Sequence, residues 1–212
     1  MTHGTATEGT EGTEFRYPQD DSVTQSDGPT PWQTVGPFFH DALCYSTGPA
    51  VAGPDRTGAF VMSGRVLDGE QNPIPDSLLE IWQADENGAF VTTAGIYEDT
   101  VRAGFRGFGR SQTDEAGRFE FRTVKPGAVP TVDGTQQAPH IAMSVFARGM
   151  LRRAVTRVYF EDEAEANHAD PLLSSLDEAR RRTLVAARTE DGYRFDVRIQ
   201  GDDETVFLDV PR

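Results

Sequence analysis

The feature that most constrains the fold of this chain is a set of short segments in which apolar and polar residues alternate. The segment at residues 118–122 reads RFEFR, and the segment at residues 193–199 reads YRFDVRI. A two-residue period is typical of a β-strand that buries one face and exposes the other. Turn-forming residues such as Lys125-Pro126-Gly127 separate these segments. The pattern predicts an all-β sandwich or barrel.

The predicted strands follow one another along most of the chain. We expect them at residues 60–67, 78–85, 118–122, 140–147, 154–160, 193–199 and 205–210. A turn at residues 201–203, which read GDD, would join the last two strands as a terminal hairpin.

One segment between these strands has a helical pattern instead. Pro171 would begin the helix, since proline is well tolerated in the first helical turn. The apolar stripe of this helix would consist of Leu173, Leu176, Leu184 and Ala187. The expected fold is therefore all-β, a sandwich with one short helical segment.

Residues 1–28 differ in composition from the rest of the chain. They hold six acidic residues against one arginine, Arg16, and few apolar residues. A segment of this kind cannot bury enough apolar surface to offset the entropy lost when it becomes ordered. We predict a disordered acidic tail at residues 1–28 and one domain at residues 29–212.

The charge of the chain excludes some classes of partner. With 34 acidic residues against 20 lysines and arginines, the net charge is −14, which disfavours binding to a phosphate backbone. No apolar run is long enough for a membrane span, and the N-terminus lacks the pattern of a secretory signal. The single cysteine, Cys44, cannot form an internal disulfide. We expect a cytoplasmic protein that binds neither nucleic acid nor membrane.

Several fragments of the sequence carry a family resemblance. They are TPWQTVGPFFH at residues 30–40, LEIWQADENG at residues 79–88, TVKPG at residues 123–127 and APHIA at residues 138–142. Together with YRFDVRIQG at residues 193–201, they resemble the intradiol ring-cleavage dioxygenases. The resemblance runs from about Thr30 to Asp209 and implies the β-sandwich of that family.

The resemblance also implies a metal centre, which this sequence does not preserve. Enzymes of the family hold Fe(III) with two tyrosines and two histidines, and a His-x-His pair on a strand points both rings to one face. His140 matches the first histidine, but the second falls on Ala142, and the two tyrosines fall on Phe90 and Val129. Three of these four side chains have no donor atom. We expect no metal ligand and no catalytic residue in this chain alone.

A degenerate copy of this kind implies a partner. In one branch of the family, an iron-bearing beta subunit pairs with a homologous alpha subunit that lacks iron. The resemblance to that branch implies an αβ hetero-oligomer in which the beta subunit holds Fe(III). The assembly would cleave protocatechuate with O₂ to 3-carboxy-cis,cis-muconate.

In such an assembly, this chain would supply part of the wall of the substrate pocket. The resemblance assigns this role to Thr34, Gly36, Pro37 and Phe38. A glycine lets the backbone approach a flat ring closely, and a proline stiffens the loop. Arg148 shares the strand parity of His140, so its guanidinium could orient the carboxylate of the substrate. Pairing with an acid at the surface is the equally weighted alternative for this arginine.

Two other functions remain open at this level. One is an intradiol dioxygenase that works alone on catechol or hydroxyquinol, against which the missing tyrosines argue. The other is a non-catalytic binding module of the transthyretin-like type, whose strands and turns have sequences similar to Gly64-x-Val66 and Pro75-Asp76. A neighbouring gene that encodes an intact ligand set would favour the subunit function over the module.

Overall fold

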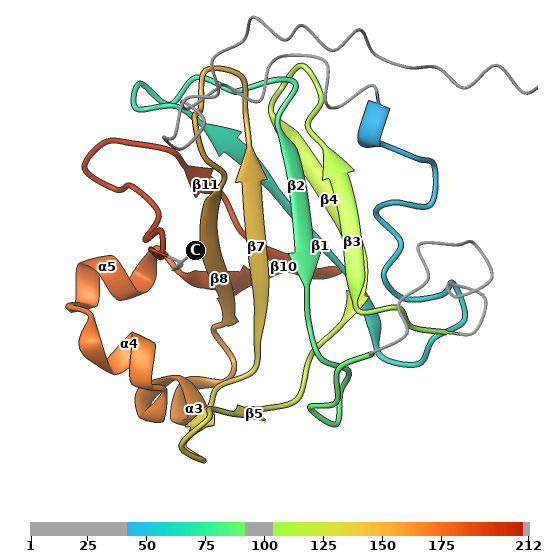
Figure 1. The fold of residues 1–212 in the computed structure, drawn as a ribbon, viewed down its shortest axis with the longest axis vertical. Helices are drawn as coiled ribbons and strands as arrows, with labels where there is room; N and C mark the ends of the chain where they lie inside the picture. The colour runs from blue at the N-terminus through green and yellow to red at the C-terminus, as the bar shows by residue number, and fades with distance from the viewer. Residues whose placement is uncertain (1–41, 92–103, 210–212) are drawn as a thin grey trace, which may run out of the picture. The chain divides into compact units, whose positions relative to one another are not determined.

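The computed structural model describes residues 42–91 and 104–209. The chain divides into two compact units, and all of the described residues lie in the second, residues 33–212. Their strands are β1 (Ala59–Leu67), β2 (Leu78–Trp82), β3 (Phe108–Gln112), β4 (Arg118–Val124), β5 (Val129–Pro130), β6 (Gln136–Gln137), β7 (His140–Phe146), β8 (Ala154–Phe160), β9 (Val185–Arg188), β10 (Gly192–Arg194) and β11 (Val197–Arg198) (Figure 1). The predicted all-β fold is confirmed.

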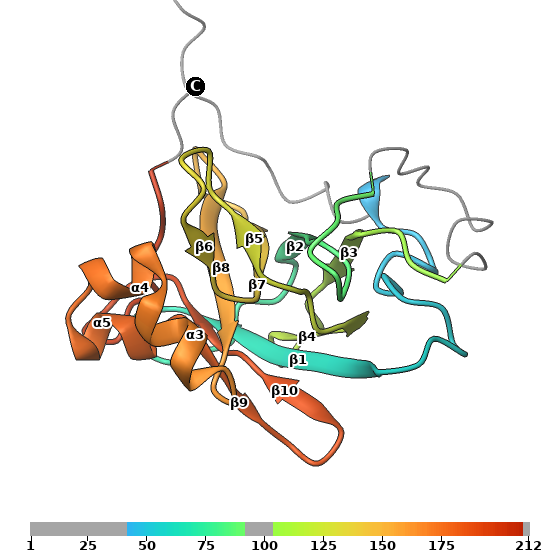
Figure 2. The same cartoon turned by 90° about the horizontal axis from the view of Figure 1, so that it is seen from below.

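The strands form two layers within one curled sheet. The order of pairing in the described residues is β11-β1-β10-β9-β8-β7-β2-β3, with β4 on the free side of β1. Figure 2 shows β1 and β4 below the layer that contains β7, β2 and β3. The short strands β5 and β6 pair with each other outside this sheet.

The core lies between the two layers and follows the alternation of the sequence. Every second residue of β4 is buried, beginning with Phe119 and Phe121, and β7 buries Ile141, Met143 and Val145 in the same way. These side chains belong to one hydrophobic cluster. The alternate residues of β7 and β4 therefore face outward, so the two outer faces carry the side chains that are free to bind.

The predicted single helix is wrong in its extent. Among the described residues, the segment contains three short helices: α3 (Ala164–Ala169), α4 (Pro171–Ser175) and α5 (Glu178–Arg182). Pro171 does begin α4, as predicted, but Ala187 lies in β9 and Leu184 follows α5. Leu173 and Leu184 are nevertheless buried together in a second cluster beside the sheet.

Two aspartates account for the breaks between these helices. The Asp170 side chain accepts hydrogen bonds from the backbone N–H groups of Leu172 and Leu173, and the Asp177 side chain accepts one from Arg180. Each aspartate therefore begins a new helix as its N-cap. Between them, Leu176 is extended (φ −101°, ψ 147°) and interrupts the helical path.

The predicted terminal hairpin forms only next to its turn, where the Thr205 N–H donates to the Arg198 carbonyl at 3.0 Å and the Arg198 N–H donates to Thr205 Oγ1 at 2.9 Å. Both β10 and β11 pair with β1 in parallel, and the chain between them bends at Phe195, whose N–H donates to the Ser63 carbonyl at 2.9 Å. Residues 205–208 form no regular strand, although the Leu208 N–H donates to the Val155 carbonyl at 2.7 Å. The predicted apolar face is confirmed at Tyr193, which is buried together with Phe195 and Val197.

Two expectations from the sequence lie outside the described residues or extend beyond them. The predicted boundary between tail and domain at residues 28 and 29 lies outside the described residues, as does Val210 at the end of the last predicted strand. In the part of the chain that the structure describes, no helix is long and apolar enough to cross a membrane.

Candidate site on the outer face of the sheet

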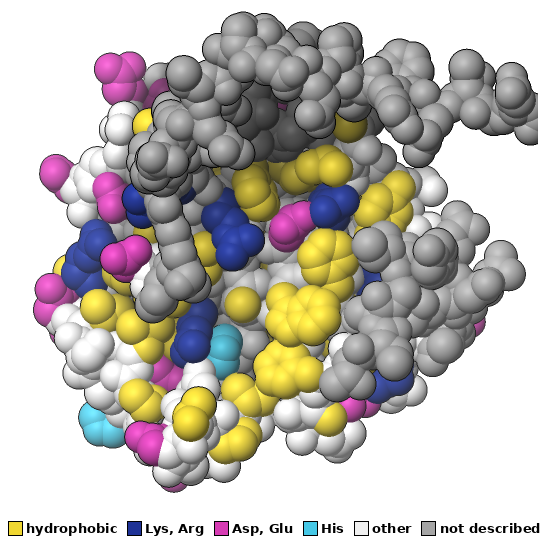
Figure 3. Space-filling view, in the orientation of Figure 1, with side chains coloured by type: hydrophobic (Ala, Val, Ile, Leu, Met, Phe, Trp, Pro, Cys, Tyr) yellow, Lys and Arg dark blue, Asp and Glu magenta, His cyan; other side chains and the backbone are white. Residues whose placement is uncertain are grey.

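The outer face of β8, β7, β2 and β3 gathers the residues that the sequence singles out. Directly opposite residues on antiparallel strands point to the same side. The strand register places Arg157, Ala142, Trp82 and Phe108 in one row across the four strands. Figure 3 shows hydrophobic side chains down the middle of this face, with a histidine and a basic side chain to their left.

The apolar part of this face consists of large aromatic side chains. Trp82 is 41% exposed, and Phe90, in the loop that follows β2, is 47% exposed. The Trp82 ring lies 6.3 Å from the ring of Phe108, centroid to centroid. Clustered aromatic groups that stay exposed mark a surface suited to contact with another molecule.

An ion pair borders these aromatic groups. In the next row of the face, Glu80 lies opposite Arg110, whose Nε and Nη2 donate to one Glu80 carboxylate oxygen at 2.9 and 2.5 Å. The Arg110 guanidinium also lies 5.6 Å from the centroid of the Phe108 ring. The Arg110 side chain is restricted by contacts with both a carboxylate and an aromatic ring, so this part of the face is rigid.

His140, at the start of β7, is held by its neighbours. Its Nδ1 lies 2.8 Å from the Ala138 carbonyl oxygen, which can only accept, so Nδ1 carries the proton. Burial, with a smaller contribution from the Arg157 charge, lowers the pKa of His140 to about 4. The imidazole is therefore neutral near pH 7, the state that a metal ligand requires.

A buried network that the sequence analysis missed supports this histidine. Tyr159 lies opposite His140, with ring centroids 5.5 Å apart, and its hydroxyl donates to Asp170 Oδ1 at 3.1 Å. Asp170 is fully buried, and its Oδ2 accepts the Ala138 N–H at 2.9 Å. The alternation of β8 could have placed Tyr159 and Arg157 on one face, but the pairing of Tyr159 with His140 depends on the strand register, and its contact with Asp170 depends on how α4 packs.

Tyr159 does not replace the missing tyrosine ligands. Burial raises the pKa of its hydroxyl, so the phenol stays protonated at neutral pH. Arg157 Nη1 donates to the same hydroxyl oxygen at 3.4 Å. The guanidinium also lies in the row of Ala142, where the family resemblance places the second histidine. A fixed positive charge at this place disfavours a bound metal cation.

The structure brings the segments of the other two ligand positions together. The turn before Phe90 is fixed by Asp85 Oδ1, which accepts the N–H groups of Asn87 and Ala89, each at 2.9 Å. The Gly127 N–H, two residues before Val129, donates to the Asp85 carbonyl at 2.8 Å. Val129 then pairs with Gln137, three residues before His140.

These residues do not fit a ferric ion. Phe90, Val129 and Ala142 offer no donor, and Tyr159 is a neutral phenol bonded to Asp170. Within residues 42–91 and 104–209, no group of three or more His, Cys, Asp or Glu side chains could hold a metal. Among the four positions that the family resemblance assigns to metal ligands, only His140 carries a donor atom.

The predicted pocket residues are only partly described. Thr34, Gly36, Pro37 and Phe38 lie outside the described residues. Arg148 follows the end of β7, its side chain is 60% exposed, and its Nε lies 3.3 Å from Asp76 Oδ2. The acid of this ion pair is largely buried, with 16% of the Asp76 side chain exposed, whereas the Arg148 side chain extends into solvent.

Comparison with known proteins agrees with this geometry. A family model described as dioxygenase matches residues 36–201. The chain is 44% identical to the protocatechuate 3,4-dioxygenase alpha chain of Burkholderia cepacia over 85% of this chain and 97% of that relative. It is 33% identical to the beta chain of the same organism, over 82% of this chain and 76% of that relative.

A solved structure supports the fold. The dioxygenase domain of a carbohydrate-binding fusion protein from Streptomyces sp. SirexAA-E superposes with a TM-score of 0.52 at 25% identity, over 82% of this chain and 99% of that domain. Together with the sequence relatives, this match supports the β-sandwich fold. The chain belongs to the dioxygenase family.

Proposed function

We propose that this chain is the alpha subunit of a protocatechuate 3,4-dioxygenase and carries no iron of its own. Two facts together support the proposal. The chain is similar to an alpha chain over nearly the whole length of that relative, and its side chains at the expected ligand positions cannot bind a metal. A dioxygenase that worked alone would need the donors that Phe90, Val129 and Ala142 lack.

The reaction of the assembly inserts both atoms of O₂ into protocatechuate. The ring opens between the two carbons that carry hydroxyl groups, and the product is 3-carboxy-cis,cis-muconate. Fe(III) held by a beta subunit would supply the Lewis acidity that activates the aromatic ring. The residues of this chain would bind and orient, and they would not take part in bond formation.

The aromatic part of the outer face is the surface that we assign to the beta subunit. Trp82 and Phe90 each keep more than a third of their surface exposed. Burying such side chains at the centre of an interface contributes strongly to binding. The rigid ion pair of Glu80 and Arg110 beside them would fix the orientation of the partner.

The pocket wall completes the proposal. Thr34, Gly36, Pro37 and Phe38 would line the substrate pocket beside the partner's iron. Arg148 would reach the substrate carboxylate with its guanidinium, since its side chain is 60% exposed and only its Nε lies near Asp76, at 3.3 Å. Such an assembly belongs in the reducing cytoplasm, where a protein with a single cysteine needs no disulfide.

Co-expression with a candidate beta chain tests the proposal. We expect the two chains to co-purify and to consume O₂ when protocatechuate is added, whereas this chain alone should show no uptake. Arg148→Gln should raise KM for protocatechuate and leave KM for O₂ unchanged, and the matched variant Arg152→Gln, in the loop that follows, should leave both unchanged. Failure of the two chains to associate would favour the binding module instead.

A further inference from the structure

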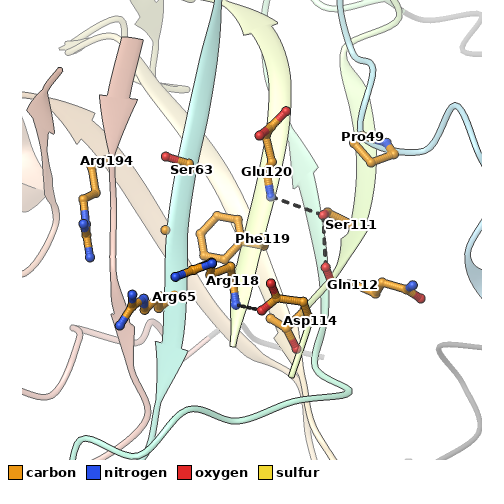
Figure 4. A pocket seen from close by; sticks show the side chains of 12 residues that line it. Pro49, Ser63, Arg65, Ser111, Gln112, Asp114, Arg118, Phe119, Glu120 and Arg194 are labelled. Carbon is orange, nitrogen blue, oxygen red and sulfur yellow. Dashed lines mark hydrogen bonds between the residues drawn. The ribbon is translucent and has the colours of Figure 1, made fainter. Parts of the chain in front are cut away.

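A groove of about 680 Å³ lies on the opposite layer of the sandwich, over the outer face of β1 and β4. Figure 4 shows three arginine side chains, Arg65, Arg118 and Arg194, gathered at one end of this groove. They come from β1, β4 and β10, strands that are distant in sequence. Two acids, Asp114 and Glu120, also line the groove, so its ends can differ in charge although the chain as a whole has a net charge of −14.

Two of these arginines face each other without a counter-charge. Arg65 and Arg118 are directly opposite on the antiparallel strands β1 and β4, and like charges in such a pair destabilise a sheet. Neither guanidinium makes a hydrogen bond or an ion pair with another of the described residues. A bound anion between the two guanidinium groups would relieve this repulsion.

The nearby acids are engaged elsewhere. Asp196 pairs with Arg194 at 3.1 Å and accepts the Arg65 backbone N–H at 3.0 Å. Asp114 Oδ1 accepts the backbone N–H groups of Ala116 and Arg118 at 2.9 and 2.8 Å. Both carboxylates therefore leave the side chains of Arg65 and Arg118 free to bind an external oxyanion.

The other end of the groove has a different chemistry. Ser63 lies opposite Glu120, and each is two residues from an arginine of the pair on its own strand. Figure 4 shows the Glu120 carboxylate directed away from the arginines. This end repels a second anion and accepts a hydrogen bond from a hydroxyl group. Side chains two residues apart on one strand face are separated by about 7 Å along it.

We propose that this groove binds a small hydroxycarboxylate anion. The carboxylate would lie between the guanidinium groups of Arg65 and Arg118. A hydroxyl group at the far end of the ligand would donate to the Glu120 carboxylate. The separation of the two ends suits a rigid ligand of the size of 4-hydroxybenzoate.

Calorimetric titration of the full chain with 4-hydroxybenzoate tests this site without any partner subunit. We expect saturable binding that Arg65→Gln/Arg118→Gln weakens at least about tenfold, since each guanidinium contributes a charge-assisted hydrogen bond. The matched control is Arg122→Gln, which removes a charge from the same face of β4 and should change the affinity less than about twofold.

Two further ligands test separately the contribution of the arginine end and of the Glu120 end of the groove to binding. Benzoate lacks the hydroxyl group and should bind more weakly than 4-hydroxybenzoate, and Glu120→Ala should abolish that difference. Phenol lacks the carboxylate and should not bind. Absence of saturable binding, or equal weakening by Arg122→Gln and the double variant, would overturn the proposal and leave the subunit function untouched.

Discussion

Replacing Asp170 with alanine tests whether the buried network behind His140 holds this end of the sandwich together. The Asp170 carboxylate accepts hydrogen bonds from the Ala138 N–H at 2.9 Å, from the Tyr159 hydroxyl at 3.1 Å and from two N–H groups at the start of α4. A lost N-cap costs about 1 kcal/mol. Each buried donor left without an acceptor costs about 1–3 kcal/mol. With two such donors, the Ala138 N–H and the Tyr159 hydroxyl, Asp170→Ala should destabilise the chain by about 3–7 kcal/mol.

Asp177 provides the matched control for this experiment. It also caps a helix, through the Arg180 N–H, but it is exposed and has no buried partner among the described residues. Asp177→Ala should cost about 1 kcal/mol or less. Urea denaturation of the full chain, followed by far-UV circular dichroism and by tryptophan fluorescence, measures both free energies of unfolding. Equal losses from the two variants would refute the reasoning, because the buried donors would then contribute nothing beyond the cap.

Three more predictions follow from the described residues. Arg106 is buried and donates to the carbonyl oxygens of Phe108, Thr47 and Gly48, so Arg106→Met should lower the free energy of unfolding by about 3 kcal/mol in urea denaturation. The pKa of His140 is lowered to about 4. Its contribution of up to about 3 kcal/mol is therefore complete above pH 6.5, and it is lost as the pH falls from there to 4. Urea denaturation at a series of pH values should therefore show a smaller change in the free energy of unfolding between pH 6.5 and 4 in His140→Gln than in the unchanged chain. Trp82→Glu places a charge in the aromatic part of the outer face and should weaken association with a beta chain at least about tenfold by sedimentation, without loss of stability.

The sequence predicts those parts of the fold that local patterns determine. The alternation around Phe119 places β4 and its buried face, and the same logic places β7 and the outward direction of His140. The prediction of a single helix from Pro171 fails for a local reason that the sequence contains. Asp170 and Asp177 are both N-cap residues, and the apolar spacing of the leucines hides the breaks that they cause.

Local sequence patterns do not determine which strands pair when they are far apart in the chain. The segment from Tyr193 reads as one strand of a hairpin, but it pairs with β1 in parallel, more than a hundred residues earlier in the chain. The same limit applies to the candidate site. His140 and Ala142 can be placed on one face from their spacing, whereas the positions of Arg157 and Tyr159 beside them depend on the register of β8.

Arg157 opposes metal binding near His140 independently of the ligand positions that lack donor atoms. Its guanidinium lies in the row of Ala142 and bonds to the Tyr159 hydroxyl at 3.4 Å, so a positive charge is built into the protein near His140. Restoring a histidine at Ala142 would therefore not restore a metal site, since the repulsion from Arg157 would remain.

The iron content of the purified proteins tests the central claim most directly. Elemental analysis of this chain alone should find no stoichiometric iron, and its visible spectrum should lack the absorption of tyrosinate bound to Fe(III). The complex with a beta chain should contain one iron for each pair of chains. Stoichiometric iron in the isolated chain, or two irons for each pair, would contradict the account.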